Sequence, residues 1–554
     1  MSTIDWIILI TTLFGIIIYG VYKSQTTKDL DGYFLSNRSL PWYMVLLSIM
    51  GTQASAVTFL SAPGQAYTDG MRFVQYYFGL PLAMIVVCIF FVPVFRKLKV
   101  YTAYEFLENR FDLKTRSLTS ALFLISRGLS TGISIYAPSI ILSSLLGWNI
   151  YYTNLVMGGM LIVYTITGGA KAVAYTQQLQ LIIIIAGMFL AGYMVINLLP
   201  DGMGFLDAIK VAGGKGKMNI ITTGVTNQHF DWKDKYNIWS GLLGGFFLSI
   251  SYFGADQSQV GRYLTAKSDK ESKIGLLTNG LVKVPMQFLI LLVGILVFSF
   301  YQYHKAPIYF DEARVIVAKK TVYKDSLVHL ENQYVNALKE NNPALATELR
   351  AEYKSIIKKA IPGDDANDTN FIFLRFVIDN LPKGLVGLLI AVIFLAAWGS
   401  IAAALNSLAS CTVVDFHKKF INKNCTEAQD YSISKWYTFG WGVFSVVVAM
   451  FAYNLGNSLI EAVNILGSLF YGVILGIFLV AFWIKYVKGN AVFIASVISE
   501  LLIILIYNLN VVSFLWLNAI GVILVIFFSV IIQLVLPSKK EKDSIPNGIS
   551  GLST

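Results

Sequence analysis

The sequence predicts an all-α, polytopic membrane protein, and three observations predict it. The chain has 554 residues, of which 56% are hydrophobic and 14% are charged, whereas ordinary globular proteins have roughly 45–50% and about 25%. Its apolar runs reach the length of about 20 residues that a membrane-spanning helix needs. Its short loops alternate in their content of Lys and Arg. These features exclude a disordered chain and a disulfide-stapled secreted scaffold.

Thirteen segments are long and apolar enough to be interpreted as membrane-spanning helices. They lie at about 5–21, 40–64, 72–95, 118–147, 150–168, 176–198, 238–258, 274–302, 376–414, 434–453, 458–484, 491–507 and 512–536. The first segment has no basic residues before it and no small-residue cleavage site after it. We therefore expect a retained helix rather than a signal peptide.

The loops between these segments predict how the chain is oriented. Basic loops lie at 22–39, 96–117, 169–175, 259–273, 415–433, 485–490 and 537–554. Loops without Lys or Arg lie at 65–71, 149, 454–457 and 508–511. Because basic loops stay in the cytoplasm, we expect the N-terminus outside and the C-terminus inside, in a plasma (inner) membrane. The net charge of +11 then reflects topology, and we expect a lipid bilayer around the protein and no nucleic-acid partner.

Two longer segments, 199–237 and 303–375, interrupt the spans on the outer side. Within the second, Lys324–Glu340 and Ala344–Lys359 have amphipathic helical periodicity, with a break between them at Asn341-Asn342-Pro343. We expect a solvated decoration there, with a partner-binding role as the alternative, and no obligate protein partner is evident. The tail 537–554 is polar and predicted to be disordered.

The sequence predicts neither an enzyme nor a metal centre. The three cysteines (Cys88, Cys411, Cys425) form no disulfide framework, and the four histidines lie in loops or at span ends without metal-ligand spacing. No nucleophile–base pair lies within the spans.

Two spans contain runs of small and hydroxyl residues near their centres. The span 40–64 is interrupted at Gly51–Ala56 and the span 238–258 at Ser249–Gly254. Such runs loosen the backbone hydrogen-bond ladder, and the freed carbonyls must then face protein, water or an ion. Two interruptions five helices apart are typical of an inverted-repeat transporter. Close helix packing through small residues is the alternative.

A third span, 376–414, presents Ser400, Ala403 and Ser407 as one small, polar helical stripe. Such a stripe can supply hydroxyl oxygens to a sodium ion beside an unwound segment. A tight helix–helix seam is the alternative interpretation.

Several short motifs, in this order and spacing, resemble those of the sodium/solute symporter family. They are Gly32-Tyr33-Phe34-Leu35, Asn37-Arg38-Ser39-Leu40-Pro41-Trp42, Ser55-Ala56-Val57-Thr58-Phe59-Leu60, Tyr136-Ala137-Pro138, Tyr164-Thr165-Ile166-Thr167-Gly168-Gly169, Asp256-Gln257-Ser258-Gln259-Val260 with Arg262-Tyr263, and Ala404-Leu405-Asn406-Ser407. The resemblance covers roughly 1–300 and 375–536, which leaves 303–375 as an insertion.

The resemblance implies a LeuT-type fold of two inverted five-helix repeats, formed by spans 2–6 and 7–11. The expected division is a first helix and linker (1–39), the first repeat (40–198), an outer loop (199–237), the start of the second repeat (238–302), the insertion (303–375), the rest of that repeat (376–484), two further helices (485–536) and the tail (537–554).

The resemblance also implies a sodium site formed by backbone carbonyls of Gly51, Ala54 and Ala396 and the hydroxyl of Ser400. The position before Ser400, a second hydroxyl in the family, is Gly399 here, so the site is weakened unless water or Gln53 replaces that ligand. The family's second sodium site is expected to be absent, because its positions are Gln177, Ala402 and Ala403. Sodium is therefore the expected coupling ion, with at most one bound per cycle.

For the solute, the resemblance and the polar residues within the spans indicate a set of candidate contacts. They are Gln53, Thr58, Gln75, Tyr77, Arg127, Ser130, Ser249, Tyr252, Lys283 and Asn464. Cations inside a membrane are costly and indicate function, so Arg127 and Lys283 are candidates for binding a hydroxylated or anionic solute. Snorkelling near a helix end is the alternative for Lys283, and Asp256 is expected to pair with Arg262.

The expected function is sodium-coupled symport of a small polar organic solute, a sugar, a polyol or a small organic anion, by alternating access. A sodium-independent or proton-coupled carrier of the same fold is the main alternative, because Gly399 leaves the sodium site with one hydroxyl ligand fewer. A channel or a sensor fits the sequence less well.

Overall fold

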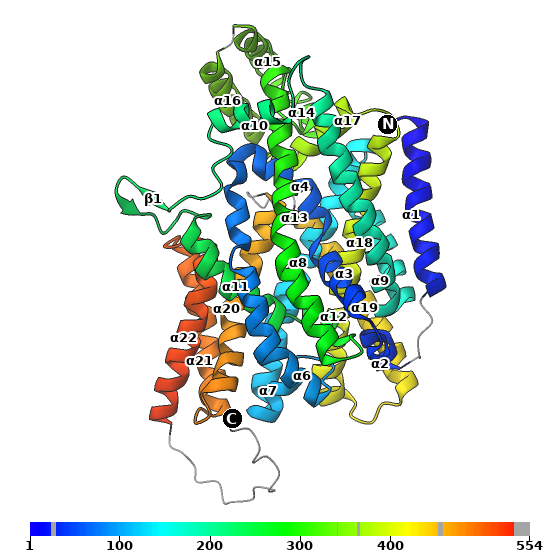
Figure 1. Cartoon of the computed structure of the whole chain (residues 1–554), viewed down its shortest axis with the longest axis vertical. Helices are drawn as coiled ribbons and strands as arrows, with labels where there is room; N and C mark the ends of the chain where they lie inside the picture. Colours follow the sequence, from blue (N-terminus) through cyan, green and yellow to red (C-terminus); the bar gives the residue numbers. More distant parts are fainter. Residues whose placement is uncertain (24–28, 341, 363–365, 453–457, 537–554) are drawn as a thin grey trace, which may run out of the picture.

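The computed structural model of the chain describes residues 1–23, 29–340, 342–362, 366–452 and 458–536. Long helices run roughly parallel to one axis and form a bundle, and a smaller helical unit stands at one end of it (Figure 1). Helix α1 (Thr3–Lys23) begins near that end, and α22 (Phe514–Val535) ends at the opposite one. The protein is thus mostly helical, as predicted.

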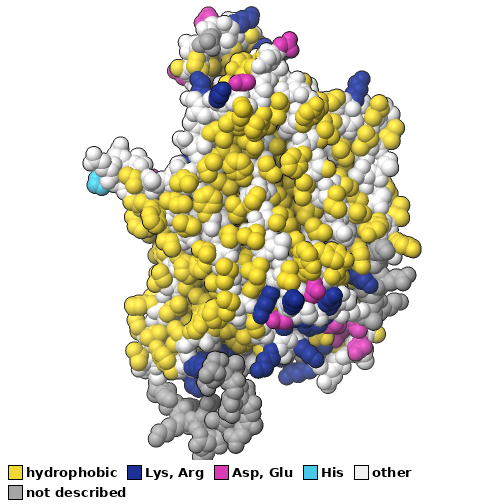
Figure 2. Space-filling view, in the orientation of Figure 1, with side chains coloured by type: hydrophobic (Ala, Val, Ile, Leu, Met, Phe, Trp, Pro, Cys, Tyr) yellow, Lys and Arg dark blue, Asp and Glu magenta, His cyan; other side chains and the backbone are white. Residues whose placement is uncertain are grey.

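The surface of the bundle is typical of a protein embedded in a bilayer. Figure 2 shows a broad belt of hydrophobic side chains, with Lys and Arg gathered below it at the end opposite the smaller unit. In the described part of the chain, nine helical segments have the length and composition of membrane spans. The count of thirteen and the orientation of the termini therefore stay predictions.

The first predicted interruption is confirmed. Helix α3 (Trp42–Gln53) ends and α4 (Ala56–Asp69) begins around Ala54 and Ser55, whose backbone angles are not helical. The Ser55 N–H, which a continuing helix would direct to Gly51, donates to the Gln53 carbonyl at 3.0 Å instead. The carbonyl of Gly51 thereby loses its usual helical partner.

The second interruption lies later than predicted. A π-helical segment (Ser240–Gly244) leads into α11 (Gly245–Gly254), which stays helical through the run 249–254. The break falls at Ala255 and Asp256, and α12 (Gln257–Leu264) follows. The Asp256 carboxylate accepts the Ser258 N–H at 2.7 Å, so this side chain caps the new helix and fixes the position of the break.

The fifth and sixth predicted spans lie within one helical element, α9 (Ile150–Asn197). The Tyr164 and Thr176 hydroxyls nevertheless lie 2.6 Å apart, whereas a straight helix would separate residues at this spacing by about 18 Å. The chain must therefore turn back between them, as expected for two spans joined by a short loop.

The predicted span 376–414 begins too early. Residues Ile372–Asn380 form a separate short helix, α17, and the long helix α18 covers Leu385–Cys411 and continues as a π-helical segment to Ile421. Pro382 restricts the preceding residue to extended backbone. Gly384 takes a φ of 90°, which only glycine adopts readily, so the helix cannot begin before Leu385.

Although the helix of the span 434–453 begins at Glu427 and two short helices lie in predicted loops, the remaining helical segments cover the other predicted spans. They are α2 (Leu30–Leu35), a 3₁₀ segment (Gly70–Tyr77), α5 (Leu80–Val86), a π-helical segment (Val87–Phe91), α6 (Val92–Leu98), α7 (Glu105–Arg110), α8 (Leu113–Leu146), α13 (Asp269–Tyr303), α19 (Glu427–Phe451), α20 (Leu459–Trp483) and α21 (Gly489–Asn508). The predicted loop 454–457 and the tail 537–554 lie outside the described residues.

Between the spans, residues 199–237 hold α10 (Phe205–Gly214) and a two-stranded hairpin of β1 (Val225–Thr226) and β2 (His229–Phe230). The insertion forms α14 (Glu312–Ala318), α15 (Lys324–Lys339) and α16 (Pro343–Ala360), close to the two helices predicted there. It has a hydrophobic core of its own, separate from that of the bundle.

The insertion is connected to α4, the second half of the first broken helix. Asp368 forms ion pairs with Arg350 at 3.0 Å and Lys354 at 2.6 Å, both on α16. The next residues form a 3₁₀ segment (Thr369–Phe371). A Cβ at Gly64 of α4 would lie 2.0 Å from the Thr369 carbonyl oxygen, so the two backbones are in close contact.

Candidate solute and sodium site

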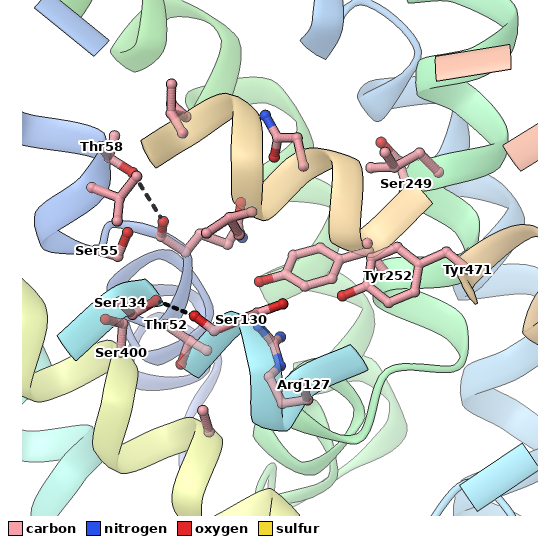
Figure 3. A pocket seen from close by; sticks show the side chains of 18 of the residues that line it. Thr52, Ser55, Thr58, Arg127, Ser130, Ser134, Ser249, Tyr252, Ser400 and Tyr471 are labelled. Carbon is pink, nitrogen blue, oxygen red and sulfur yellow. Dashed lines mark hydrogen bonds between the residues drawn. The ribbon is translucent and has the colours of Figure 1, made fainter. Parts of the chain in front are cut away.

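A polar cavity of about 140 Å³ lies beside the first break and α11. One buried water needs about 10–15 Å³ by this measure, so the cavity can hold a small organic molecule. Figure 3 shows Thr52 and Ser400 on one side of it and the rings of Tyr252 and Tyr471 on the other.

Most of the predicted solute contacts line this cavity. They are Gln53, Thr58, Tyr77, Arg127, Ser130, Ser249, Tyr252, Lys283 and Asn464. Gln75 does not: its amide donates to the Tyr236 carbonyl at 3.0 Å and accepts the Thr222 N–H at 3.1 Å. The 3₁₀ segment that carries Gln75 turns it toward the outer loop 199–237, a geometry that the predicted regular helix did not include.

The sequence interpretation missed other polar lining residues. They are Thr52, Ser55, Tyr76, Thr131, Ser134 and Tyr471. Ser134 could have been found, because it follows Ser130 by one helical turn and therefore shares its face of α8.

A buried ion pair lies at one wall of the cavity, and it corrects the expected Asp256–Arg262 pair. Arg127 Nη2 on α8 lies 3.0 Å from Asp256 Oδ2, at the second break, and the Tyr471 hydroxyl donates to the same oxygen at 2.7 Å. Two guanidinium nitrogens of Arg262 are instead buried without a hydrogen-bond partner in the described part of the chain. The Asp256 carboxylate therefore uses one oxygen to cap α12 and the other to pair with Arg127 on α8.

Lys283, on α13, is the second cation of the cavity. It is 2% exposed, and its Nζ lies 5.6 Å from the centre of the Tyr77 ring. Among the described residues it forms no ion pair or hydrogen bond. Arg127 is paired with Asp256, whereas the Lys283 amine has no acidic partner among the described residues. Burial at mid-helix excludes snorkelling to the membrane interface.

The predicted sodium ligands lie on or beside α3 and α18, which are in contact with each other and with α9. Ser400 Oγ donates to the carbonyls of Ala396 at 3.0 Å and Ala397 at 3.1 Å, which leaves the lone pairs of the hydroxyl oxygen available. Ser400 also lines the cavity, beside Thr52 and Ser55 of the first break. Hydroxyl and freed carbonyl oxygens are ligands that suit a hard cation.

The family model described as the sodium:solute symporter family matches residues 33–339 and 346–499. The chain belongs to this family. The resemblance in the short motifs is thereby confirmed, and the chain is a membrane transporter of a family that couples transport to sodium.

Relatives in the family cover nearly the whole chain. A sodium/sialic acid symporter of Aliivibrio fischeri is 24% identical over 98% of this chain and 95% of its own length. A sodium/sialic acid symporter of Proteus mirabilis is 26% identical over 90% and 88%. A sodium/glucose cotransporter of Vibrio parahaemolyticus is 24% identical over 89% and 83%.

The symporter fold is shared with a solved structure. A sodium-coupled sialic acid symporter in a substrate-bound, outward-open state superposes with a TM-score of 0.77, at 24% identity, over 97% of this chain and 98% of that one. The two broken helices of the present chain therefore belong to the fold of a transporter of this kind.

Proposed function

We propose that this symporter carries a small, hydroxylated organic anion into the cell together with sodium. The observation that carries the proposal is the buried amine of Lys283, which has no acidic partner among the described residues and lies in a cavity lined by hydroxyls, amides and apolar side chains. A buried cation is stabilised when an anion binds beside it. The sialic acid symporters among the relatives support a carboxylate as that anion and the plasma membrane as the location.

The cation site and the cavity share the first break, which gives a physical basis for coupling. Sodium bound by Gly51, Ala54, Ala396 and Ser400 holds α3 against α18 and orders Thr52, Ser55 and Thr58 at the cavity wall. An inside-negative potential of 100 mV contributes about 2.3 kcal/mol per sodium ion, but the entry of a monovalent anion costs the same amount, so the two terms cancel. With one sodium per anion, a tenfold sodium gradient contributes about 1.4 kcal/mol and supports about tenfold accumulation of the solute.

The alternative is a sodium-independent or proton-coupled carrier, and Gly399 favours it because one hydroxyl ligand is missing. The carboxylates within the spans give a proton-coupled mechanism little support. Glu461 forms an ion pair with Lys235 near the outer end of α20, and Glu500 lies on α21, away from the residues that line the cavity.

The test is the thermal stability of the purified protein with a panel of sugars, polyols, sugar acids and monocarboxylates, in sodium and then in potassium. We expect an anionic solute to stabilise the protein in sodium only, by about 2.7 kcal/mol at 100 times its dissociation constant. In Lys283→Met the anion should bind at least thirtyfold more weakly, while a neutral analogue is less affected. Equal stabilisation in potassium would instead establish the sodium-independent carrier.

A further inference from the structure

Two glycines face α9 at the proposed ion site, and two glutamines of α9 fill the space beside them. A Cβ at Gly51 on α3 would lie 2.8 Å from Cβ of Gln177. A Cβ at Gly399 on α18 would lie 2.4 Å from Oε1 of Gln180. Both approaches are closer than real Cβ atoms allow, so these glutamines occupy the volume that larger residues would take.

The amide of Gln177 is fully used in connecting the three helices. Its oxygen accepts the Ser48 hydroxyl at 2.8 Å, and its nitrogen donates to the Gly399 carbonyl at 2.9 Å and to the Thr52 hydroxyl at 3.2 Å. Gln177 therefore has a structural explanation, because both its oxygen and its nitrogen have partners.

The amide of Gln180 has no such explanation. Its side chain is 3% exposed, and within the described residues it makes no hydrogen bond. Its Nε2 is buried without a partner, which is costly for a polar group taken out of water. Its oxygen points at the one position where the resemblance predicts a hydroxyl ligand and the sequence has glycine.

The missing ligand and this oxygen would be close neighbours. A serine at residue 399 would carry its hydroxyl one bond from a Cβ that lies 2.4 Å from Gln180 Oε1, so the two side chains would compete for the same space. An amide carbonyl is a hard oxygen ligand of the same kind as a hydroxyl or a backbone carbonyl. Gln53 cannot fill this role as well, because its amide is held toward α13, donating to Asn279 Oδ1 at 3.1 Å.

We propose that the side-chain carbonyl of Gln180 replaces the hydroxyl that Gly399 lacks and completes the sodium site with Ser400, Ala396 and the first break. This inference rests on the proposed sodium coupling. Gly399 is then required for the sodium site, because only a glycine at this position leaves room for the Gln180 amide.

The experiment measures sodium binding without solute. Purified wild type and variants are titrated with sodium at constant ionic strength, balanced by potassium, with thermal stabilisation and ²²Na⁺ binding as readouts. Gln180→Met keeps the volume and removes the hard oxygen, so its apparent sodium affinity should fall at least tenfold. Gln180→Glu keeps an oxygen and should bind sodium at least as well as wild type.

A double variant tests whether the Gln180 oxygen and a serine hydroxyl at residue 399 can replace each other. Gln180→Ala alone should lose sodium binding, and Gln180→Ala with Gly399→Ser should recover it, because the vacated space now accepts a serine hydroxyl. The matched control is Gln287→Met on α13, a buried glutamine whose two side-chain polar atoms also have no partner in the described part of the chain. It should leave sodium affinity unchanged.

The outcomes separate the two proposals. If wild type shows no sodium-dependent signal, the proposed sodium coupling fails. If wild type binds sodium and Gln180→Met binds it equally well, a water or another group completes the site and the role of Gln180 is overturned. If the double variant folds but does not regain sodium, Gln180 acts through packing and not as a ligand.

Discussion

The two helix breaks of this symporter have opposite local chemistry. At the first, between α3 and α4, the flanking residues Ala54 and Ser55 carry no charge, and the backbone is freed at Gly51. At the second, between α11 and α12, the charged Asp256 caps the new helix and pairs with Arg127. One break leaves its polar groups available, and the other uses them within the protein.

This difference shows that the two broken helices do not share the same chemistry at their breaks. The first break faces the small residues of α18 and the glutamines of α9, which suits a cation held by neutral oxygens. The second break is neutralised by a fixed cation, so it serves as a rigid wall of the cavity. We therefore expect substitutions at the second break to affect stability, and those at the first to affect ion binding.

The largest effect is expected for Asp256→Asn. The substitution keeps the shape of the side chain but leaves Arg127 buried without its counter-charge, which costs about 3–5 kcal/mol in buried pairs. Thermal unfolding in detergent measures this loss. Asp269→Asn, which removes an exposed pair with Lys273, is the control and should change stability by less than about 1 kcal/mol. Equal, small effects of both would contradict the assignment of Asp256 as the counter-ion.

A smaller effect is expected for Asp368→Asn, in the segment that joins the insertion to α4. Burial raises the pKa of Asp368, but the positive charges of Arg350 and Lys354 outweigh it and hold the pKa below its ordinary value. The charged form therefore stabilises the fold above the unfolded-state pKa of about 3.9, and this contribution is lost as the pH falls through the lower, folded-state pKa.

At pH 7 we expect Asp368→Asn to cost about 2 kcal/mol, because two cations lose a largely buried partner. The difference between variant and wild type should shrink below about pH 4. Thermal unfolding at pH 7, 5 and 3.5 checks this sign, and a difference that grows on acidification would contradict it.

The smallest effect on free energy is expected for Ser400→Ala at the first break. Apparent sodium affinity should fall about tenfold, which corresponds to about 1.4 kcal/mol. Stability in potassium should barely change, because the hydroxyl donates only to carbonyls of its own helix. Parallel titrations with sodium and potassium separate a loss of sodium affinity from a loss of stability. An equal loss of stability in both salts would indicate a packing role for Ser400.

The sequence predicted the helical membrane fold and the first break because their signals are local. Apolar length and small-residue runs act within one segment. The second break was placed too early because its position depends on a helix cap, and the pairing of that cap with Arg127 joins distant segments. Gln75 was misplaced because its 3₁₀ turn departs from regular helical geometry.

Gln180 was missed although the sequence contains a signal for it. Gln177, Gln178 and Gln180 lie at the start of a largely apolar span, and Gln177 and Gln180 are three residues apart, so these two share one helix face. Two amides on one face of a membrane helix require partners. Only the contact with Gly399 on α18 identifies Gln180 as the glutamine with an unbonded oxygen. That contact joins helices that are far apart in the sequence.

The insertion is placed so that a label on it can report movement of α4. Its core is independent of the bundle, and Asp368 links it to the segment whose backbone contacts Gly64 on α4. Helix α4 therefore cannot swing away without breaking this contact or displacing the insertion. A fluorophore on an exposed position such as Val328 would then act as an external reporter of the transport cycle, placed where it disturbs neither the ion nor the solute.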